Sequence, residues 1–162
     1  MNVHEERMCE LQAEVFERSA TCFPCTSNLF ASRFMRSKTA KKLDDSKDAY
    51  NYCSSDEALF ELAQDYPSLK ESKGEKLPVF ILRWMGYIYR AFSILKSASS
   101  LEIYKRLKPE KLCGLYESFH TFDPDYCVER LAEILGWGGH GGLSDYQIYR
   151  QVRLSLRNKT NP

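Results

Sequence analysis

Only one of the three histidines, His120, has the neighbours that acid–base catalysis needs. It lies in the segment YESFHTFD, where Glu117 and Asp123 are each three positions away. An imidazole beside a carboxylate can move protons near neutral pH. However, nothing nearby supplies a nucleophile or oxyanion donors, so we predict no catalytic residue. We favour a structural role, in which His120 bonds to a carbonyl or to Asp123 and orders the turn into the next helix.

The cysteines offer a second kind of chemistry through one close pair, Cys22 and Cys25, in CFPC. A zinc site needs a second pair, or histidines, at comparable spacing, and the sequence has none. A thioredoxin-like pair follows a strand, whereas this pair connects two predicted helices. The six irregularly spaced cysteines, without a signal peptide, favour free thiols in a reducing compartment. We predict inert thiols, no metal and no cofactor, with redox or metal chemistry at this pair as the alternative.

Basic residues gather in three stretches that are candidates for contact with nucleic acid. They are Arg33, Arg36, Lys38, Lys41, Lys42 and Lys47; then Lys105, Arg106, Lys108 and Lys111; then Arg150, Arg153 and Arg157. The segment 100–119 has the order of a helix-turn-helix, but its turn carries proline rather than glycine. Solvated helix faces give the same pattern, and the net charge of +1 creates no chain-wide field toward nucleic acid or anionic lipid. Direct nucleic-acid binding is therefore an alternative and not the favoured interpretation.

The segment WMGYIYR contains an unusual density of aromatic side chains. At helical spacing Trp84, Tyr87 and Ile88 share one face, and Tyr89 lies on another. Trp, Tyr and Arg are favoured at protein-binding hot spots, so Trp84, Tyr87, Tyr89 and Arg90 are candidates for a partner surface. The alternative is a core helix whose tyrosine hydroxyls reach the rim. We favour the core, with part of the face shared with a partner.

The elements that must position these residues are helices, because apolar residues recur at a period close to 3.6 and strand alternation is absent. The predicted helices cover about 4–21, 27–45, 54–66, 78–97, 99–107, 109–119, 124–135 and 144–157, with a solvated loop at 67–77. The segment 78–97 is apolar on most of its circumference, which places it at the centre of a bundle. Gly86 within this segment predicts that another helix crosses closely there.

Capping residues mark several of the predicted helix starts. Ser27 is the expected N-cap of the second helix, and Asp123 followed by Pro124 forms an N-cap and first-turn pair. After residue 135 the segment GWGGHGG (136–142) has five glycines in seven residues, which is typical of a flexible joint. We therefore divide the chain into a helical bundle at 1–136 and a joint with an amphipathic C-terminal helix at 137–162.

Length and composition agree with this outline. A chain of 162 residues, 43% hydrophobic and 28% charged, is typical of one soluble domain. No apolar run reaches the ~18–20 residues that span a bilayer, and the start is polar and acidic. We expect a cytoplasmic, all-α protein: a single bundle of about six to eight helices, with its C-terminal helix attached through the glycine-rich joint.

Three segments in order resemble a group of small bacterial helical proteins. They are RWMGYIYRAFS (83–93), EIYKRLKPEKL (102–112) and LYESFHTFD (115–123), which fit the pattern W-x-G-Y-x-Y-R, I-Y-K and Y-x-x-F-H-T-F-D. The segment LFASRFMRSKTAKKLDD (29–45) is also similar, so the resemblance covers about residues 5–135 and departs after 136. Such proteins are often encoded in operons resembling toxin–antitoxin modules, beside ADP-ribosyltransferase-like or uncharacterised partners. The resemblance implies no catalytic residue.

The function we expect is a non-enzymatic, antitoxin-like component of a bacterial toxin–antitoxin-type or mobile-element locus, which contacts a protein partner encoded nearby. The motif residues are candidates for partner binding or for structural roles: Trp84, Tyr87, Tyr89, Arg90, Tyr104, Lys105, Tyr116, His120 and Asp123. The first alternative is a nucleic-acid-binding regulator that uses the basic stretches. The second is an enzyme with His120 as its acid–base residue.

Overall fold

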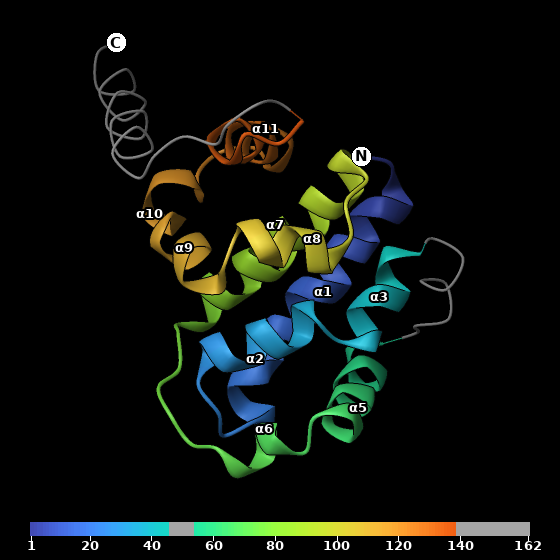
Figure 1. Cartoon of the computed structure of the whole chain (residues 1–162), viewed down its shortest axis with the longest axis vertical. Coiled ribbons are helices and arrows are strands. Elements are labelled where there is room, and N and C mark those ends of the chain that lie inside the picture. Colours follow the sequence, from blue (N-terminus) through green and yellow to red (C-terminus); the bar gives the residue numbers. More distant parts are fainter. Residues whose placement is uncertain (46–53, 139–162) are drawn as a thin grey trace.

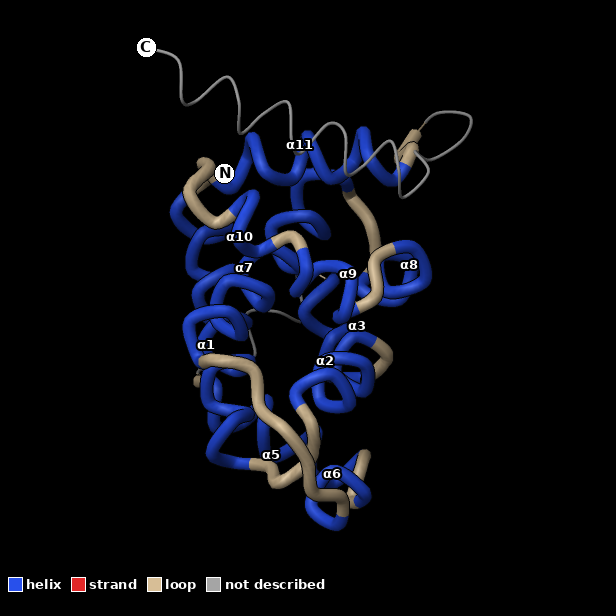
Figure 2. Tube along the Cα trace, turned by 90° about the vertical axis from the view of Figure 1, so that its left-hand side faces the viewer, coloured by secondary structure: helices blue, strands red, loops and turns tan. Residues whose placement is uncertain are grey.

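Two long helices, α1 (Val3–Cys22) and α7 (Val79–Lys96), pack along each other at the centre of an all-α bundle (Figure 1). The computed structural model describes residues 1–45 and 54–138. The other helices in these ranges are α2 (Ser27–Met35), α3 (Lys38–Asp44), α5 (Ser55–Asp65), α6 (Ser68–Glu71), α8 (Ser100–Arg106), α9 (Pro109–Gly114), α10 (Tyr116–Phe119) and α11 (Pro124–Leu135). Helix and loop account for all of the described trace (Figure 2). The predicted fold class is confirmed.

Helix α7 occupies the central position that its apolar circumference predicts. The central part of the helix is buried, from Leu82 through Met85, Ile88 and Phe92. Gly86 lies where α7 meets α1, and a Cβ built there would be 2.6 Å from the carbonyl oxygen of Gln12. The close crossing expected at Gly86 is therefore present, with the backbone of α1 as the neighbour.

A cluster of aromatic rings joins α2 to this central pair. Phe16 of α1 makes edge-on contacts with Phe30 and Phe34 of α2, with ring centroids 5.4 and 5.1 Å apart. Tyr89 of α7 approaches the same ring at 6.1 Å. These rings are fully or almost fully buried, so α2 is fixed to the core by the hydrophobic effect.

The start and length of the second helix differ from expectation. Its N-cap is Thr26, whose hydroxyl accepts from the Leu29 backbone N–H, while the Ser27 hydroxyl accepts from the Leu77 N–H at 2.8 Å. Ser27 thus fastens the incoming loop instead of capping the helix. The segment expected as one helix is divided between α2 and α3 at Ser37, which caps α3 by accepting from the Ala40 N–H at 3.0 Å.

Two other segments also differ from expectation. The predicted solvated loop contains the short helix α6, whose Leu69 is fully buried in the hydrophobic core. The predicted helix at 109–119 is divided at Leu115 into α9 and α10. The two divisions and the additional helix α6 raise the number of helices over residues 1–45 and 54–138 to ten.

Helix α11 begins and ends as its sequence indicates. Asp123 is its N-cap, accepting from the Asp125 N–H at 3.0 Å, and Gly136 ends it with a left-handed φ of 61°. The next residue, Trp137, packs edge-on against Phe92 with ring centroids 5.0 Å apart. The predicted C-terminal helix and most of the glycine joint lie outside the described residues. No helix among the described residues has the length and apolar character needed to cross a bilayer.

Candidate functional site

Six of the nine candidate residues lie in three places that the sequence does not separate. We call them the buried network (Gln12, Asp44, Arg90, Ser93 and Ser100), the aromatic surface (Val79, Phe80, Trp84, Tyr116 and His120) and the basic surface (Arg36, Lys41, Tyr104, Lys105 and Lys108). Tyr87 and Tyr89 belong to the core of α7, and Asp123 caps α11.

Arg90 is the centre of the buried network, with only 1% of its side chain exposed. Its Nε donates to the Gln12 side-chain oxygen and its Nη1 donates to Asp44 Oδ1, each at 2.8 Å. Its Nη2 donates to the Ser100 hydroxyl at 3.3 Å. Burial lowers the pKa of Arg90, and the neighbouring Asp44 carboxylate acts in the opposite direction.

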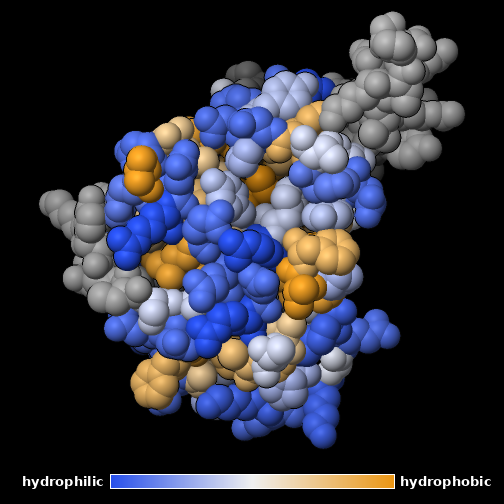
Figure 3. Space-filling view, turned by 180° about the vertical axis from the view of Figure 1, so that it is seen from behind, coloured by the Kyte–Doolittle hydropathy of each residue, from blue (hydrophilic) through white to orange (hydrophobic). Residues whose placement is uncertain are grey.

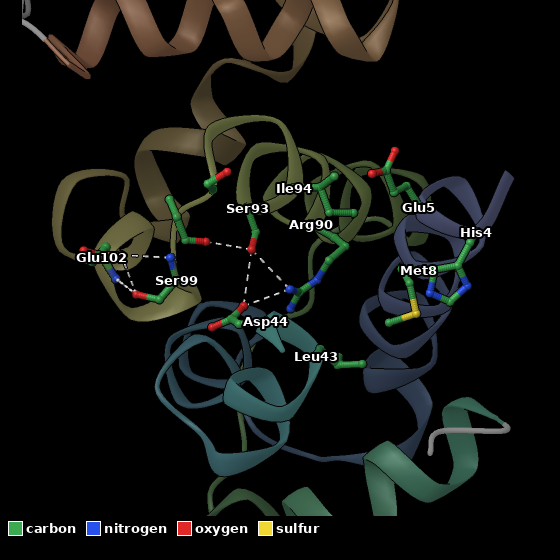
Figure 4. A pocket seen from close by; sticks show the side chains of 12 residues that line it. His4, Glu5, Met8, Leu43, Asp44, Arg90, Ser93, Ile94, Ser99 and Glu102 are labelled. Carbon is green, nitrogen blue, oxygen red and sulfur yellow. Dashed lines mark hydrogen bonds and ion pairs between the residues drawn. The ribbon is translucent and has the colours of Figure 1, made fainter. Parts of the chain in front are cut away.

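Asp44 completes the network from the end of α3. Its carboxylate accepts from the Ser100 backbone N–H at 2.8 Å and from the Ser100 hydroxyl at 2.6 Å. The Ser93 hydroxyl donates to it at 3.3 Å (Figure 4). One carboxylate therefore joins α3 to α7 and to the start of α8. The sequence indicated Arg90 but not Asp44, because nothing local marks a lone aspartate as the partner of a distant arginine.

A pocket of about 510 Å³ opens beside this network (Figure 4). Met8, Leu43, Ile94 and Ala98 form the apolar part of its walls, and the other lining residues are polar or charged. Both glutamates that line it are engaged within the chain: Glu5 accepts from the Asn2 N–H at 2.7 Å, and Glu102 accepts from the Ser99 N–H at 2.9 Å. Arg90 and Asp44 also line it and are bonded as described above. The charges here therefore hold helices together.

The positions of Tyr87 and Tyr89 agree with the interpretation of WMGYIYR as part of a core helix. Tyr89 is fully buried and donates its hydroxyl to the Leu107 carbonyl at 2.9 Å. Burial raises its pKa well above the ordinary value. Tyr87 is half-buried, and burial raises its pKa to about 12, with Cys9 and Glu10 adding to the rise. Both rings pack against the core.

The aromatic surface is a chain of touching rings from α7 and α10. Tyr116 lies 5.6 Å from Phe80, 5.3 Å from Trp84 and 4.5 Å from His120, measured between ring centroids. Phe80 is 56% exposed and Val79 is 48% exposed. On the rear face of the molecule, apolar residues form separate islands among hydrophilic ones (Figure 3). The aromatic surface therefore joins exposed apolar area to a ring cluster that reaches the core.

His120 and Asp123 are each engaged with a backbone group. His120 is exposed, stacks on Tyr116, and donates its Nδ1–H to the Tyr116 carbonyl at 2.9 Å. The Asp123 side chain accepts from the Asp125 N–H. This geometry places the histidine at the end of α10 and the aspartate at the start of α11, where each orders its own helix end.

The basic surface is built around the ring of Tyr104. The Arg36 guanidinium lies 5.1 Å from the ring centroid, and Lys108 Nζ lies 3.6 Å from it. The Tyr104 hydroxyl is 2.8 Å from the Ser32 hydroxyl. This hydrogen bond lowers the pKa of Tyr104, and the two cations lower it further. Two basic stretches that are far apart in the sequence therefore meet at one ring, and nothing in the local sequence pattern indicates this meeting.

A hollow of about 270 Å³ extends the basic surface toward α3. It is lined by Arg36, Lys38 and Lys41, together with Met35, Ser37, Asp44, Ser99 and Leu101. Lys38 is 3.9 Å from Asp65. Among the described residues, no carboxylate lies within 4.0 Å of the charged groups of Arg36, Lys41, Lys105 or Lys108.

The described cysteines are free thiols. Cys22 is exposed at the end of α1, while Cys25 is buried and its pKa is raised by burial. Burial also raises the pKa of Cys9 to about 12, which favours the unreactive thiol form. Residues 1–45 and 54–138 contain no group of three or more His, Cys, Asp and Glu side chains arranged to hold a metal ion.

Comparison of the chain with protein-family models, curated proteins and solved structures gives no match. The three places described above differ in what they can bind. Of these, the buried network holds helices together, whereas the aromatic and basic surfaces face solvent with groups that can bind.

Proposed function

We propose that the chain is a non-enzymatic, antitoxin-like protein that binds a protein partner encoded nearby through its aromatic surface. The observation that carries the proposal is the ring chain of the aromatic surface, which begins at an exposed phenylalanine and continues inward to a half-buried tryptophan. Exposed apolar groups of this kind, joined to further rings, are typical of binding sites.

The composition of the surface supports a protein as the ligand. Tryptophan and tyrosine are enriched among the residues that dominate binding energy, because they bury much area with few rotatable bonds. The stacked His120 adds a polar edge beside Tyr116, which suits the rim of an interface. A large aliphatic or aromatic side chain of the partner is the complementary anchor.

The surface is also held in place before binding. Trp84 lies on α7, the central helix, and Tyr116 contacts its ring edge-on with an interplanar angle of 87°. Tyr116 is in turn stacked on His120 with an angle of 12°. Side chains already ordered in the free protein lose less entropy when a partner docks, so they contribute more to affinity.

The test is the affinity of the purified chain for the product of the adjacent gene, measured by calorimetry. Phe80→Ser removes an exposed ring, and we expect it to weaken binding about 10-fold or more while the circular dichroism spectrum stays unchanged. The matched control is Phe60→Ser, because Phe60 on α5 is also exposed, at 68%, and should leave binding unchanged. Wild-type affinity in Phe80→Ser, or no complex with the wild-type chain, would refute the proposal.

A further inference from the structure

We propose that the basic surface binds the phosphate backbone of double-stranded nucleic acid. The inference does not rest on the aromatic surface or on a protein partner. It starts from the meeting of α2, α8 and the start of α9 around Tyr104, and from the charges that this meeting leaves facing solvent.

The first step is the convergence of distant segments. Ser32 and Tyr104 are 72 positions apart and their hydroxyls are 2.8 Å apart. This contact brings Arg36, at the end of α2, to the same ring as Lys108, at the start of α9. The fold therefore turns two ordinary basic stretches into one surface.

The second step is the lack of acidic partners for these cations among the described residues. Arg36 and Lys108 both lie over Tyr104, which attracts each of them through its ring but does not cancel their mutual repulsion. Lys41 lines the adjoining hollow. Lys105 is exposed on α8, one helical turn after Leu101, which also lines that hollow. A ligand that carries negative charge would relieve this repulsion.

The third step concerns the carboxylates nearby. Asp44 lines the hollow, but its oxygens already accept from Arg90 and Ser100. Glu102 on α8 is engaged as the cap of Ser99, and Asp65 is 3.9 Å from Lys38. Glu102 still carries its negative charge and acts on Lys105 and Arg106, and the exposed Glu110 lies two positions after Lys108. The four cations of the basic surface outnumber these two carboxylates, so the local excess of charge is positive.

The fourth step identifies which part of a nucleic acid fits. The ring of Tyr104 has two cations over it, so it is not free to stack on a base, as it would be in a single-strand binding groove. The groups that remain are point charges and a guanidinium, which contact phosphates and carry no sequence information. The structure therefore favours binding to a duplex backbone without preference for sequence.

The size of the effect follows from counterion release. Four phosphate contacts, one for each of Arg36, Lys41, Lys105 and Lys108, give a slope of about −3.6 in log affinity against log salt concentration. Raising the salt from about 50 to about 200 mM should then weaken binding on the order of 100-fold.

The experiment is fluorescence anisotropy with the full chain and two labelled DNA duplexes of unrelated sequence, over this salt range. We expect the two duplexes to bind equally, with the slope given above. The variant Arg36→Gln/Lys108→Gln should make the slope shallower, at about −1.8, and weaken binding about 10-fold or more at low salt. The matched control, Arg83→Gln/Lys96→Gln, removes the same charge from α7, where both cations are paired with glutamates, and should bind as wild type.

Several results would overturn the proposal. If the control variant lost as much affinity for the duplexes, the loss would come from the change in net charge and not from the basic surface. A strong preference for one duplex would show that the protein recognises bases. Failure of the wild-type chain to bind either duplex at low salt would also refute it. A titration with vesicles containing an anionic phospholipid completes the test, because binding to vesicles without binding to duplex would make the surface a membrane contact.

Discussion

Helix α7 and the basic surface use the same residue types in opposite ways. Each cation of α7 has a carboxylate partner: Arg83 pairs with Glu10 and Glu17, Arg90 with Asp44, and Lys96 with Glu129. On the basic surface, Arg36 and Lys108 share an aromatic ring instead. Charge that is paired between helices adds cohesion, whereas charge left toward solvent is available to a ligand.

The pKa values of the tyrosines in the two regions are shifted in opposite directions. Burial raises the pKa of both Tyr87 and Tyr89 on α7. The hydrogen bond to Ser32 and the two nearby cations lower the pKa of Tyr104. The first region thus disfavours a negative charge and the second attracts one.

Removing the carboxylate of the buried pair should cause the greatest loss of stability. Asp44→Asn leaves the buried Arg90 charge without compensation, and such losses amount to about 3–5 kcal/mol. The free energy of unfolding in urea measures it. Glu129→Gln is the matched control, since Glu129 is exposed and its pair with Lys96 should contribute less than about 1 kcal/mol. A similar small loss in both variants would mean that the Arg90 network does not stabilise the bundle.

The crossing of α1 and α7 should be the next most sensitive point. In Gly86→Ala the new Cβ would meet Gln12 O at 2.6 Å and Ala13 Cα at 2.9 Å, both backbone atoms, so we expect a loss of about 1–3 kcal/mol. Gly114→Ala is the control, because a Cβ there meets nothing within 4 Å and alanine favours a helix. The melting temperature should therefore fall in Gly86→Ala and rise in Gly114→Ala. Equal shifts in the two variants would contradict the close crossing.

The junction between α10 and α11 lies outside both regions and should show a smaller effect. Asp123→Ala removes the N-cap acceptor of α11 and should cost about 0.5–2 kcal/mol in denaturant unfolding. Asp123→Asn keeps an acceptor of similar geometry, so it should retain most of the stability that Asp123→Ala loses. If asparagine and alanine behaved alike, the hydrogen bond to the Asp125 N–H would not be the source of the stability.

Loss of the Tyr104 hydroxyl should have the smallest effect on stability at neutral pH, but it should change the ultraviolet absorbance of tyrosinate clearly. Its lowered pKa means that its ionisation favours the folded state as pH rises toward the unfolded value of about 10, and that this contribution is lost as pH falls through the folded pKa. Tyr87 has the opposite sign, since its raised pKa costs the fold stability above pH ~10.

The measurement is the ultraviolet absorbance of tyrosinate during an alkaline titration. The difference between wild type and Tyr104→Phe should appear at lower pH than the difference between wild type and Tyr87→Phe. In Arg36→Gln/Lys108→Gln, the Tyr104 signal should move to higher pH. If that signal stays at its original position, the two cations do not act on the ring.

The sequence predicted what depends on local pattern. Helix α7, its close crossing at Gly86, and the start of α11 at Asp123 and Pro124 all follow from period, a missing side chain and capping chemistry. Local pattern was also where one error arose, because Thr26 and Ser27 are both good caps and the tertiary contact of Ser27 with Leu77 decided between them.

The sites were harder to predict because they join distant segments. Arg90 and Asp44 are 46 positions apart, and neither has a neighbour in sequence that indicates the other. The two basic stretches each read as a solvated helix face, and only the packing of α8 against α2 reveals that they form one surface. Rings at 80, 84, 116 and 120 come together for the same reason.

The double position of Asp44 has a consequence for the geometry of the surface. Its carboxylate is bonded to a buried arginine on one side and lines the basic hollow on the other. The same carboxylate fixes the end of α3, which carries Lys41, to the start of α8, which carries Lys105. The buried network therefore determines a distance on the surface. The separation between Lys41 and the cations of α8 depends on the bonds from Asp44 to Ser100, which a ligand on the solvent side does not need to contact.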